Sequence, residues 1–342
     1  MNKCAVIGAT GYTGIELVKI LIQHPSVEIV GLTTRQKQSI PVRDLIPALG
    51  PSCDLMIETY SFEAIKRKAD VVFLCLPHTE AMETAEKFLK AGKIVIDLSA
   101  DFRLKKVKDY EKWYKVRHSA PHLLKKAVYG APEFFRKDIG QADLIANPGC
   151  YPTAAYLAVV PLLQRGLVES EDIIIDAKSG VTGAGKKLNP ATQFCEVHEN
   201  FYAYKVAQHQ HTPEIEQILS DCAQKAAKVT FVTHLLPVRR GILATVYMKK
   251  KKNIRLQEIS KAFREAYRGE PFVRVKPEGV FPSLKDVERT NFCDLGFTVE
   301  EKTGRVIVVS AIDNLLKGAS GQAVQNMNIR LGFPETKGIC SL

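Results

Sequence analysis

Residues 3–14 read KCAVIGATGYTG, a short apolar run that leads directly into three glycines spaced three residues apart. Apolar residues then recur at helical spacing as far as residue 24, and residues 27–32 are again apolar and β-branched. A strand, a glycine turn, a helix and a second strand predict the start of a doubly wound sheet. Glycines in such a turn let the backbone approach a pyrophosphate, whereas the alternative is an ordinary glycine-rich turn. The candidate dinucleotide contacts are Gly8, Thr10, Gly11, Tyr12, Thr13 and Gly14.

The pattern of strands changes at about residue 150. Before it, apolar runs at 71–76 and 94–96 flank a helical pattern and continue the alternation of strands and helices. After it, strands follow one another without intervening helices, as in a mixed or antiparallel sheet. The sequence therefore predicts an α/β chain with a Rossmann-type cofactor domain and a second, α+β domain with a mixed sheet. The later strands are expected at 229–234, 241–249, 292–299 and 305–312, and an amphipathic helix at 318–331 is expected to return to the first domain.

Composition indicates a folded chain with a surplus of basic residues. Its 342 residues suffice for about two domains, and 46% apolar with 25% charged residues exclude fibrous and disordered classes. The net charge of +11 favours an anionic ligand. No aromatic residues interleave the basic clusters, and no apolar run approaches the roughly 20 residues that cross a bilayer, so we expect neither nucleic acid nor a membrane as partner. Eight cysteines without a C-x-x-C pair, and a strand at the very start, favour a cytoplasmic location.

The end of the second predicted strand distinguishes the two nicotinamide cofactors. NAD enzymes usually place an acidic residue there, whereas an arginine accommodates the 2′-phosphate of NADP. The sequence reads Leu32-Thr-Thr34-Arg35, so we expect NADP, bound with the help of Thr34 and Arg35. The alternative for Arg35 is a solvated loop position.

A candidate nucleophile lies at the domain boundary. Cys150 follows Asn147-Pro-Gly149 and precedes Pro152, a residue suited to the first turn of a helix. The positive end of a helix favours thiolate over thiol, whereas the alternative is a small buried hydrophobe. A thiolate beside a nicotinamide site indicates acyl transfer through a thioester linked to an aldehyde by hydride exchange.

The acid/base group for this chemistry is expected among the histidines. His209 and His211 precede Thr212-Pro-Glu214, which has the pattern of a helix start. An H-x-H pair with a glutamate is also conceivable as a metal site, but no further ligand motif accompanies it, so we expect no metal.

In total the chain resembles the N-acetyl-gamma-glutamyl-phosphate reductase family. The matching stretches follow one another over nearly the whole chain: GATGYTG at 8–14, DLSADFR at 97–103, YGAPE at 129–133, ANPGCYPT at 146–153, SGVTGAG at 179–185, HTPEI at 211–215 with His209 before it, HLLPVRRGI at 234–242 and NLLKGASGQA at 314–323.

The resemblance implies the NADPH-dependent reduction of N-acetyl-L-glutamyl 5-phosphate to the 5-semialdehyde and phosphate in arginine biosynthesis. It makes Cys150 the nucleophile and His209 the acid/base. The implied substrate-binding residues are Arg103, Asn147, His211 and Glu214, and the implied further cofactor contacts are Ser179, Gly180, Gly183 and Asn314. It also implies a split cofactor domain at 1–149 and 315–342, a catalytic domain at 150–314, and a homodimer or homotetramer.

Related proteins share several of these motifs. Aspartate-semialdehyde dehydrogenase and the aminoadipyl-phosphate reductase of lysine biosynthesis share the cofactor turn and the cysteine chemistry, and a dinucleotide sensor is the alternative outside the enzymes. His211 competes with His209 for the acid/base role. Arg103, Arg239 and Arg240 each remain candidates for an anionic ligand, with a solvated or structural position as the alternative.

Overall fold

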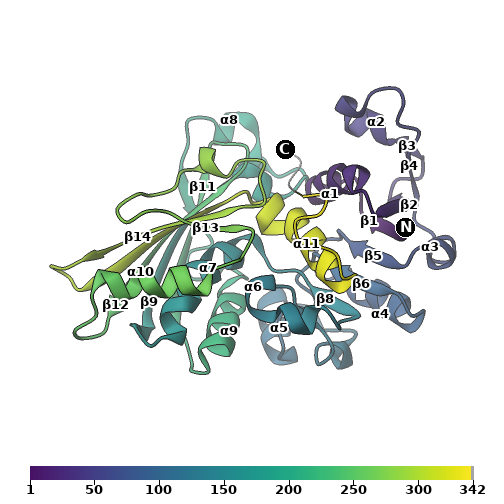
Figure 1. Ribbon diagram of the computed structural model, residues 1–342. Helices are drawn as coiled ribbons and strands as arrows, with labels where there is room; N and C mark the ends of the chain where they lie inside the picture. Colours follow the sequence, from purple (N-terminus) through teal and green to yellow (C-terminus); the bar gives the residue numbers. More distant parts are fainter. Residues whose placement is uncertain (340–342) are drawn as a thin grey trace. The chain divides into compact units, whose positions relative to one another are not determined.

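The computed structural model describes residues 1–339, which form two compact units (Figure 1). Unit 1 contains residues 1–148 and the segment from residue 319 onward, and unit 2 contains residues 149–318. Residues 340–342, the end of the predicted cofactor domain, lie outside the described residues. Within residues 1–339 no helix is long and apolar enough to cross a bilayer.

Unit 1 is built on an eight-stranded sheet in the order β3-β4-β2-β1-β5-β6-β8-β7. All paired strands are parallel except the short β3, which runs antiparallel to β4. The strand order reverses at the neighbouring pair β1 and β5, and ligands of doubly wound sheets bind outside the carboxyl ends of such a pair. The strands are β1 (Asn2–Ile7), β2 (Val27–Thr34), β3 (Ile40–Pro41), β4 (Met56–Thr59), β5 (Val71–Leu74), β6 (Ile94–Asp97), β7 (Val128–Tyr129) and β8 (Leu144–Ala146).

The central strands of unit 1 are apolar because helices cover both faces of a doubly wound sheet. All four residues of β5 are fully buried, as are the last four of β1 apart from a trace of exposure at Ile7. The helices are α1 (Tyr12–Gln23), α2 (Val42–Leu45), α3 (Phe62–Lys68), α4 (Met82–Lys90), α5 (Val107–Tyr114), α6 (Pro132–Ile139) and α11 (Gly321–Arg330).

Helix α11 comes from the far end of the sequence and packs in unit 1 beside α1 and α6 (Figure 1). It is buried at every position from Gly321 to Asn328, and several of the buried side chains are amides. Asn326 donates to the carbonyl of Gly130 at 3.0 Å, and Gln322 donates to the same oxygen at 3.2 Å. Because buried amides are stable only when hydrogen-bonded, these contacts specify where the helix sits. A π-helical turn, Leu316–Ser320, replaces the beginning of the predicted 318–331 helix.

Unit 2 is built on a seven-stranded sheet in the order β10-β11-β9-β12-β15-β14-β13. The pairs β11–β9 and β13–β14 are parallel and the others are antiparallel, which confirms the predicted mixed sheet. Burial alternates along β9 and β12, so one face of the sheet is covered and the other is half exposed. The strands are β9 (Val168–Gly180), β10 (Tyr202–Tyr204), β11 (Val229–Leu236), β12 (Ile242–Lys250), β13 (Val273–Val275), β14 (Cys293–Glu300) and β15 (Arg305–Ile312).

Three helices lie on the covered face: α7 (Cys150–Gln164), α9 (Thr212–Ala223) and α10 (Leu256–Ala266) (Figure 1). Helix α7 is buried on all sides from Tyr151 to Leu163, as its uniformly apolar sequence requires. The position of Cys150 at its first residue is therefore held by the core of unit 2. The short α8 (Phe194–Val197) lies in an exposed segment before β10.

A buried acidic pair supports the loop that follows β5 in unit 1. Asp101 accepts hydrogen bonds from the backbone of Thr79 at 2.7 Å and Ala81 at 2.9 Å, and from the hydroxyl of Tyr110 at 2.8 Å. Thr79 needs this support because its φ of 76° is strained for a β-branched residue. Burial, and then the charge of Asp101, raises the pKa of Asp97 from its ordinary 3.8 to about 7.

This shift predicts a specific dependence of stability on pH. Because the folded chain holds the Asp97 proton more tightly than the unfolded chain, the stabilising contribution is complete below about pH 4 and is lost as the pH rises to about 7. The side chain of Asp97→Asn cannot ionise, so the variant lacks this loss of stability. We expect the free energy of unfolding of the variant minus that of the native chain to increase by more than about 1 kcal/mol from pH 5 to pH 8. Urea titrations at both pH values measure this difference. Asp138→Asn, an exposed site in α6, is the control, and a constant difference for Asp97→Asn would contradict the prediction.

Candidate active site

The glycine turn of unit 1 has the geometry of a phosphate cradle. Gly8 has a φ of 88°, and a Cβ there would lie 2.4 Å from the carbonyl oxygen of Cys75; a Cβ on Gly14 would lie 2.4 Å from that of Gly8. The protein itself therefore requires these two glycines. A Cβ on Gly11 would meet no protein atom closer than 3.8 Å. The space beside Gly11 is therefore open, as the close approach of a pyrophosphate would require.

The start of α1 is open to an anion. Gly11 is the N-cap residue, so no side chain caps the helix, and the first turn carries no acidic residue. The free N–H groups and the positive end of the helix dipole favour a phosphate there. Tyr12 and Thr13 belong to this first turn, and Thr13 accepts a hydrogen bond from Ser320 at 2.8 Å. Thr10, in the turn itself, is half-buried.

The structure gives Arg35 a neighbour that the sequence did not reveal. Its guanidinium forms an ion pair with Glu80, which lies in the loop after β5. Both side chains are exposed. Thr34, at the end of β2, is buried and accepts a hydrogen bond from the backbone of Gln36 at 3.3 Å. The Arg35 guanidinium, which is predicted to bind a 2′-phosphate, thus follows β2 and is paired with the Glu80 carboxylate. A bound phosphate would compete with this carboxylate for the guanidinium.

In unit 2, Cys150 lies at the start of α7 and its side chain is half-buried. The N-cap is Gly149, without a side-chain cap and without an acid in the first turn. The N–H of Gly149 donates to Oε1 of Glu214 at 2.8 Å. The other carboxylate oxygen of Glu214 lies 2.8 Å from Nδ1 of His211. A single carboxylate, only 1% exposed, therefore ties the start of α7 to the histidine segment.

The hydrogen bonds of the two histidines define their tautomers. The backbone N–H of His211 donates to Nδ1 of His209 at 3.2 Å, so neutral His209 carries its proton on Nε2. His211 faces the Glu214 carboxylate with Nδ1, so its own Nε2 is an acceptor when neutral. When both rings are neutral, His209 presents a proton and His211 a lone pair.

Aromatic rings enclose His209, which is 8% exposed. The ring centroids of Tyr151, Phe231 and Tyr204 lie 5.5, 5.4 and 5.8 Å away, and the ring of His211 is 5.0 Å away. The hydroxyls of Tyr151 and Tyr204 are 3.0 Å apart. These contacts restrict the imidazole to one position.

The turn before α11 packs directly on the cysteine. A Cβ on Gly318 would lie 2.7 Å from Cβ of Cys150 and 3.2 Å from its Cα, so any larger residue there would displace Cys150. The turn is fixed by the fully buried Asp313, which accepts from the backbone of Leu315 at 2.9 Å and Arg289 at 2.7 Å. Arg240 completes this site with two contacts to the carboxylate, at 2.8 and 3.0 Å.

The two neighbouring arginines thus differ in position. Arg240 is buried and held by Asp313, whereas Arg239 is exposed. The carbonyl of Arg239 accepts a hydrogen bond from Thr182 at 3.1 Å, which brings it beside the loop that follows β9.

That loop carries the predicted cofactor residues of unit 2. A Cβ on Gly180 would lie 2.7 Å from the backbone nitrogen of Arg240, so packing requires this glycine. A Cβ on Gly183 would lie 2.7 Å from the side-chain Oγ of Ser179, which would have to move. Asn314 holds the loop in place: it donates to Thr182 Oγ1 at 3.0 Å and accepts from the N–H of Gly241 at 2.7 Å.

Arg103 and Asn147 lie in unit 1 and form internal contacts. Arg103 is 5% exposed and donates to the carbonyls of Asn147 and Leu98, both at 2.8 Å. The amide of Asn147 donates to the carbonyl of Ala319 at 3.1 Å and accepts from Asn326 at 3.0 Å. Both residues hold the segment that leads to Cys150.

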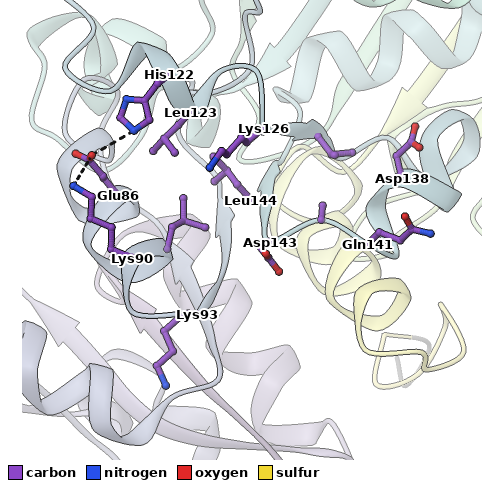
Figure 2. A pocket seen from close by; sticks show the side chains of 14 residues that line it. Glu86, Lys90, Lys93, His122, Leu123, Lys126, Asp138, Gln141, Asp143 and Leu144 are labelled. Carbon is purple, nitrogen blue, oxygen red and sulfur yellow. Dashed lines mark ion pairs between the residues drawn. The ribbon is translucent and has the colours of Figure 1, made fainter.

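A separate groove of about 700 Å³ lies in unit 1 (Figure 2). Lys93 and Leu144, which line it, lie at the amino-terminal ends of β6 and β8, the sheet edge opposite the glycine turn. Glu86 forms ion pairs there with Lys90 at 2.8 Å and His122 at 3.4 Å. None of the predicted site residues lines this groove. Among residues 1–339, no three histidine, cysteine or acidic side chains form a group that could hold a metal ion.

Sequence patterns did not reveal Tyr204, Asp313 or Gly318 as parts of the site. Tyr204 lies in no recognisable motif, and its approach to Tyr151 results from the pairing of β10 with β11. Asp313 immediately precedes the NLLKGASGQA stretch, and Gly318 lies within it. The family resemblance therefore marked this segment but assigned no role to either residue.

Two family profiles match the chain. Residues 3–142 match the NAD-binding domain of semialdehyde dehydrogenase, and residues 150–314 match the semialdehyde dehydrogenase dimerisation domain. Solved structures share the fold at low identity. Aspartate-semialdehyde dehydrogenase of Candida albicans, solved with NADP, has a TM-score of 0.74 and 16% identity, covering 96% of this chain and 98% of its own. Aspartate-semialdehyde dehydrogenase II of Vibrio cholerae has a TM-score of 0.73 and 15% identity, covering 97% and 98%.

Curated relatives are far more similar in sequence. The N-acetyl-gamma-glutamyl-phosphate reductase of Pelotomaculum thermopropionicum is 53% identical over 98% of this chain and 97% of its own length. The proteins of the same name from Symbiobacterium thermophilum and Citrifermentans bemidjiense are 51% and 49% identical over 98% and 99% of this chain, and 97% and 98% of their own. The chain therefore belongs to the N-acetyl-gamma-glutamyl-phosphate reductase family, an oxidoreductase family with the semialdehyde dehydrogenase fold.

Proposed function

We propose that this chain reduces N-acetyl-L-glutamyl 5-phosphate to N-acetyl-L-glutamate 5-semialdehyde and phosphate, with NADPH as reductant, in arginine biosynthesis. The observation that carries the proposal is the site of unit 2, in a chain about half identical to reductases of that name. In this site Glu214 joins the helix start at Cys150 to His211, which in turn contacts His209. The same biosynthetic role is the reason to propose a cytoplasmic location.

The cysteine supplies the covalent chemistry. The Cys150 thiolate attacks the carbonyl carbon of the acyl phosphate, a C–S bond forms, and the C–O bond to phosphate breaks. NADPH, when bound, supplies the hydride that reduces the thioester. The glycine turn of unit 1 fits such a dinucleotide, because protein packing requires Gly8 and Gly14 and leaves space beside Gly11. The C–S bond then breaks, which returns the thiolate and releases the aldehyde.

The histidines move the protons. His209 donates the Nε2 proton to the oxygen on which charge develops, which is the role of a general acid. The hydrogen bond that its Nδ1 accepts from the backbone of His211 supports this assignment. Glu214, whose two oxygens are already bound, holds the helix start and orients His211. His211 and the exposed Arg239 offer polar groups for the substrate. Arg103 and Asn147, the proposed substrate-binding residues of unit 1, also fix the segment that leads to Cys150 through their contacts to the protein.

The matched dimerisation domain supports a homo-oligomer, and we propose a homodimer as its smallest form. The half-exposed face of the unit 2 sheet carries apolar residues on neighbouring central strands. An exposed apolar face of this kind is typical of a surface that a partner subunit covers. Ile174, Leu243, Tyr247 and Val309 lie on it.

The reaction is tested in reverse, with N-acetyl-glutamate semialdehyde, phosphate and NADP, by following absorbance of the reduced cofactor. We expect phosphate-dependent turnover that Cys150→Ser abolishes while NADPH binding is kept, because a hydroxyl is a far weaker nucleophile. Cys195→Ser, at an exposed cysteine, is the matched control. Activity confined to aspartate or aminoadipate semialdehyde would contradict the substrate, and turnover by Cys150→Ser would contradict the thioester.

Loss of the general acid should slow the chemical step selectively. We expect His209→Ala to lower kcat on the order of 10²- to 10⁴-fold with little change in cofactor affinity. Steady-state kinetics and NADPH fluorescence titration measure the two effects. His198→Ala, in the exposed segment after α8, is the control. An unchanged kcat would transfer the acid/base role to His211.

The NADP preference rests on Arg35. We expect Arg35→Ala to raise KM for NADPH about tenfold or more and to leave KM for NADH nearly unchanged, because one charge-assisted contact to the 2′-phosphate is lost. Arg43→Ala, an exposed arginine with a loose ion pair to Asp54 at 3.9 Å, is the control. Equal changes with both cofactors would exclude Arg35 from recognition of the phosphate.

A further inference from the structure

We propose that Glu80 sets the cofactor selectivity of this chain, because its ion pair with Arg35 competes with the 2′-phosphate of NADPH for the same guanidinium. The inference rests on the proposed function, since it assigns a further residue to the proposed NADPH site. Glu80 acts through Arg35 and lowers the affinity for NADPH. NADH carries a 2′-hydroxyl in place of the phosphate, so its binding leaves the ion pair intact.

Strand pairing brings the two side chains to the same edge of the unit 1 sheet. Strand β1 lies between β2 and β5, and all three run parallel. Ile7 at the end of β1 is paired with Thr33 on one side and with Leu74 on the other. Arg35 follows β2 and Glu80 lies in the loop after β5, so both lie beyond the carboxyl ends, where the glycine turn begins. In such a sheet the adenine ribose of a dinucleotide lies at the end of the second strand, beside this pair.

The loop that carries Glu80 is held on both sides of this residue. The backbone N–H groups of Thr79 and Ala81 donate to the two carboxylate oxygens of Asp101 at 2.7 and 2.9 Å. Asp101 is fully buried, which keeps these bonds out of competition with water. The backbone of Glu80 is therefore fixed, and only its side chain can turn away from Arg35.

The backbone on the arginine side is fixed as well. The hydroxyl of Thr34 accepts from the N–H of Gln36 at 3.3 Å, and the carbonyl of Gln36 accepts from the hydroxyl of Thr59 at 3.1 Å. Thr59 is the last residue of β4, which pairs with β2. The side chains of Arg35 and Glu80 are 62% and 38% exposed, so a ligand can reach both without any opening of the fold.

The exposure of the pair makes it displaceable. Exposed ion pairs are weak, because water screens both charges and two long side chains lose freedom. A phosphate carries more negative charge than a carboxylate and forms strong charge-assisted hydrogen bonds with a guanidinium, so it displaces Glu80 from Arg35. The free energy of the broken ion pair is subtracted from the binding of NADPH and from no other step. Selectivity between the two cofactors is therefore smaller than Arg35 alone would give.

The test measures the dissociation constants of NADPH and NADH in the intact, substrate-free protein, by titration of the cofactor fluorescence. We expect Glu80→Gln to lower Kd for NADPH about three- to tenfold and to change Kd for NADH less than about twofold, because the amide keeps the shape of the side chain without its charge. A general disturbance of the fold would alter both constants, so the selective change identifies competition.

Glu83→Gln is the matched control, because it removes the same charge from the first turn of α4, where Glu83 pairs with Lys87 at 2.7 Å. Both of its constants should equal those of the native chain. A second comparison removes the cation: in an Arg35→Ala background, Glu80→Gln should change neither constant by more than about twofold, since the two residues act as one pair.

An unchanged Kd for NADPH in Glu80→Gln would overturn the proposal, as would an equal gain for both cofactors or a full gain that persists without Arg35. Weaker binding of NADH would overturn it too, since the carboxylate would then be a contact of the ribose. Because the titration contains no substrate, its result is independent of the proposed reaction. A chain that fails to reduce the acyl phosphate can still show the selective gain, whereas the native constants alone test the NADP preference.

Discussion

The carboxylate of Glu214 is the interaction on which the unit 2 site depends. Its two oxygens accept from Gly149 and from His211, each at 2.8 Å, and the side chain is almost completely buried. A carboxylate at this depth is stable only because both oxygens have donors and because it lies in the first turn of α9, where the helix dipole favours negative charge. The starts of α7 and α9 are thereby fixed to each other.

This arrangement separates tasks that a cysteine–histidine pair usually combines. In such pairs the imidazole takes the thiol proton, but here the backbone of His211 occupies Nδ1 of His209 and leaves a donor on the other side. In the proposed reaction, the Nε2–H of His209 is the proton donor to a substrate oxygen.

Local features could be predicted from the sequence, and features formed by distant segments could not. The glycine turn and the helix start at Cys150 are encoded within a few residues, and the structure has both. The same local pattern does not indicate that protein packing requires glycine at positions 8 and 14 but not at position 11. Arg240 and Asp313 are far apart in the sequence, so the choice between Arg239 and Arg240 required the fold. The ion pair of Arg35 with Glu80 was invisible for the same reason.

The route of the chain through unit 1 has a consequence for its synthesis. Unit 2 is one continuous segment, whereas unit 1 needs the residues from 319 onward to satisfy the carbonyl of Gly130 and the amide of Asn147. A ribosome releases the whole of unit 2 before α11 emerges, although most of unit 1 was translated earlier. The surface of unit 1 that α11 covers therefore stays exposed until translation ends. During this interval a chaperone could bind it.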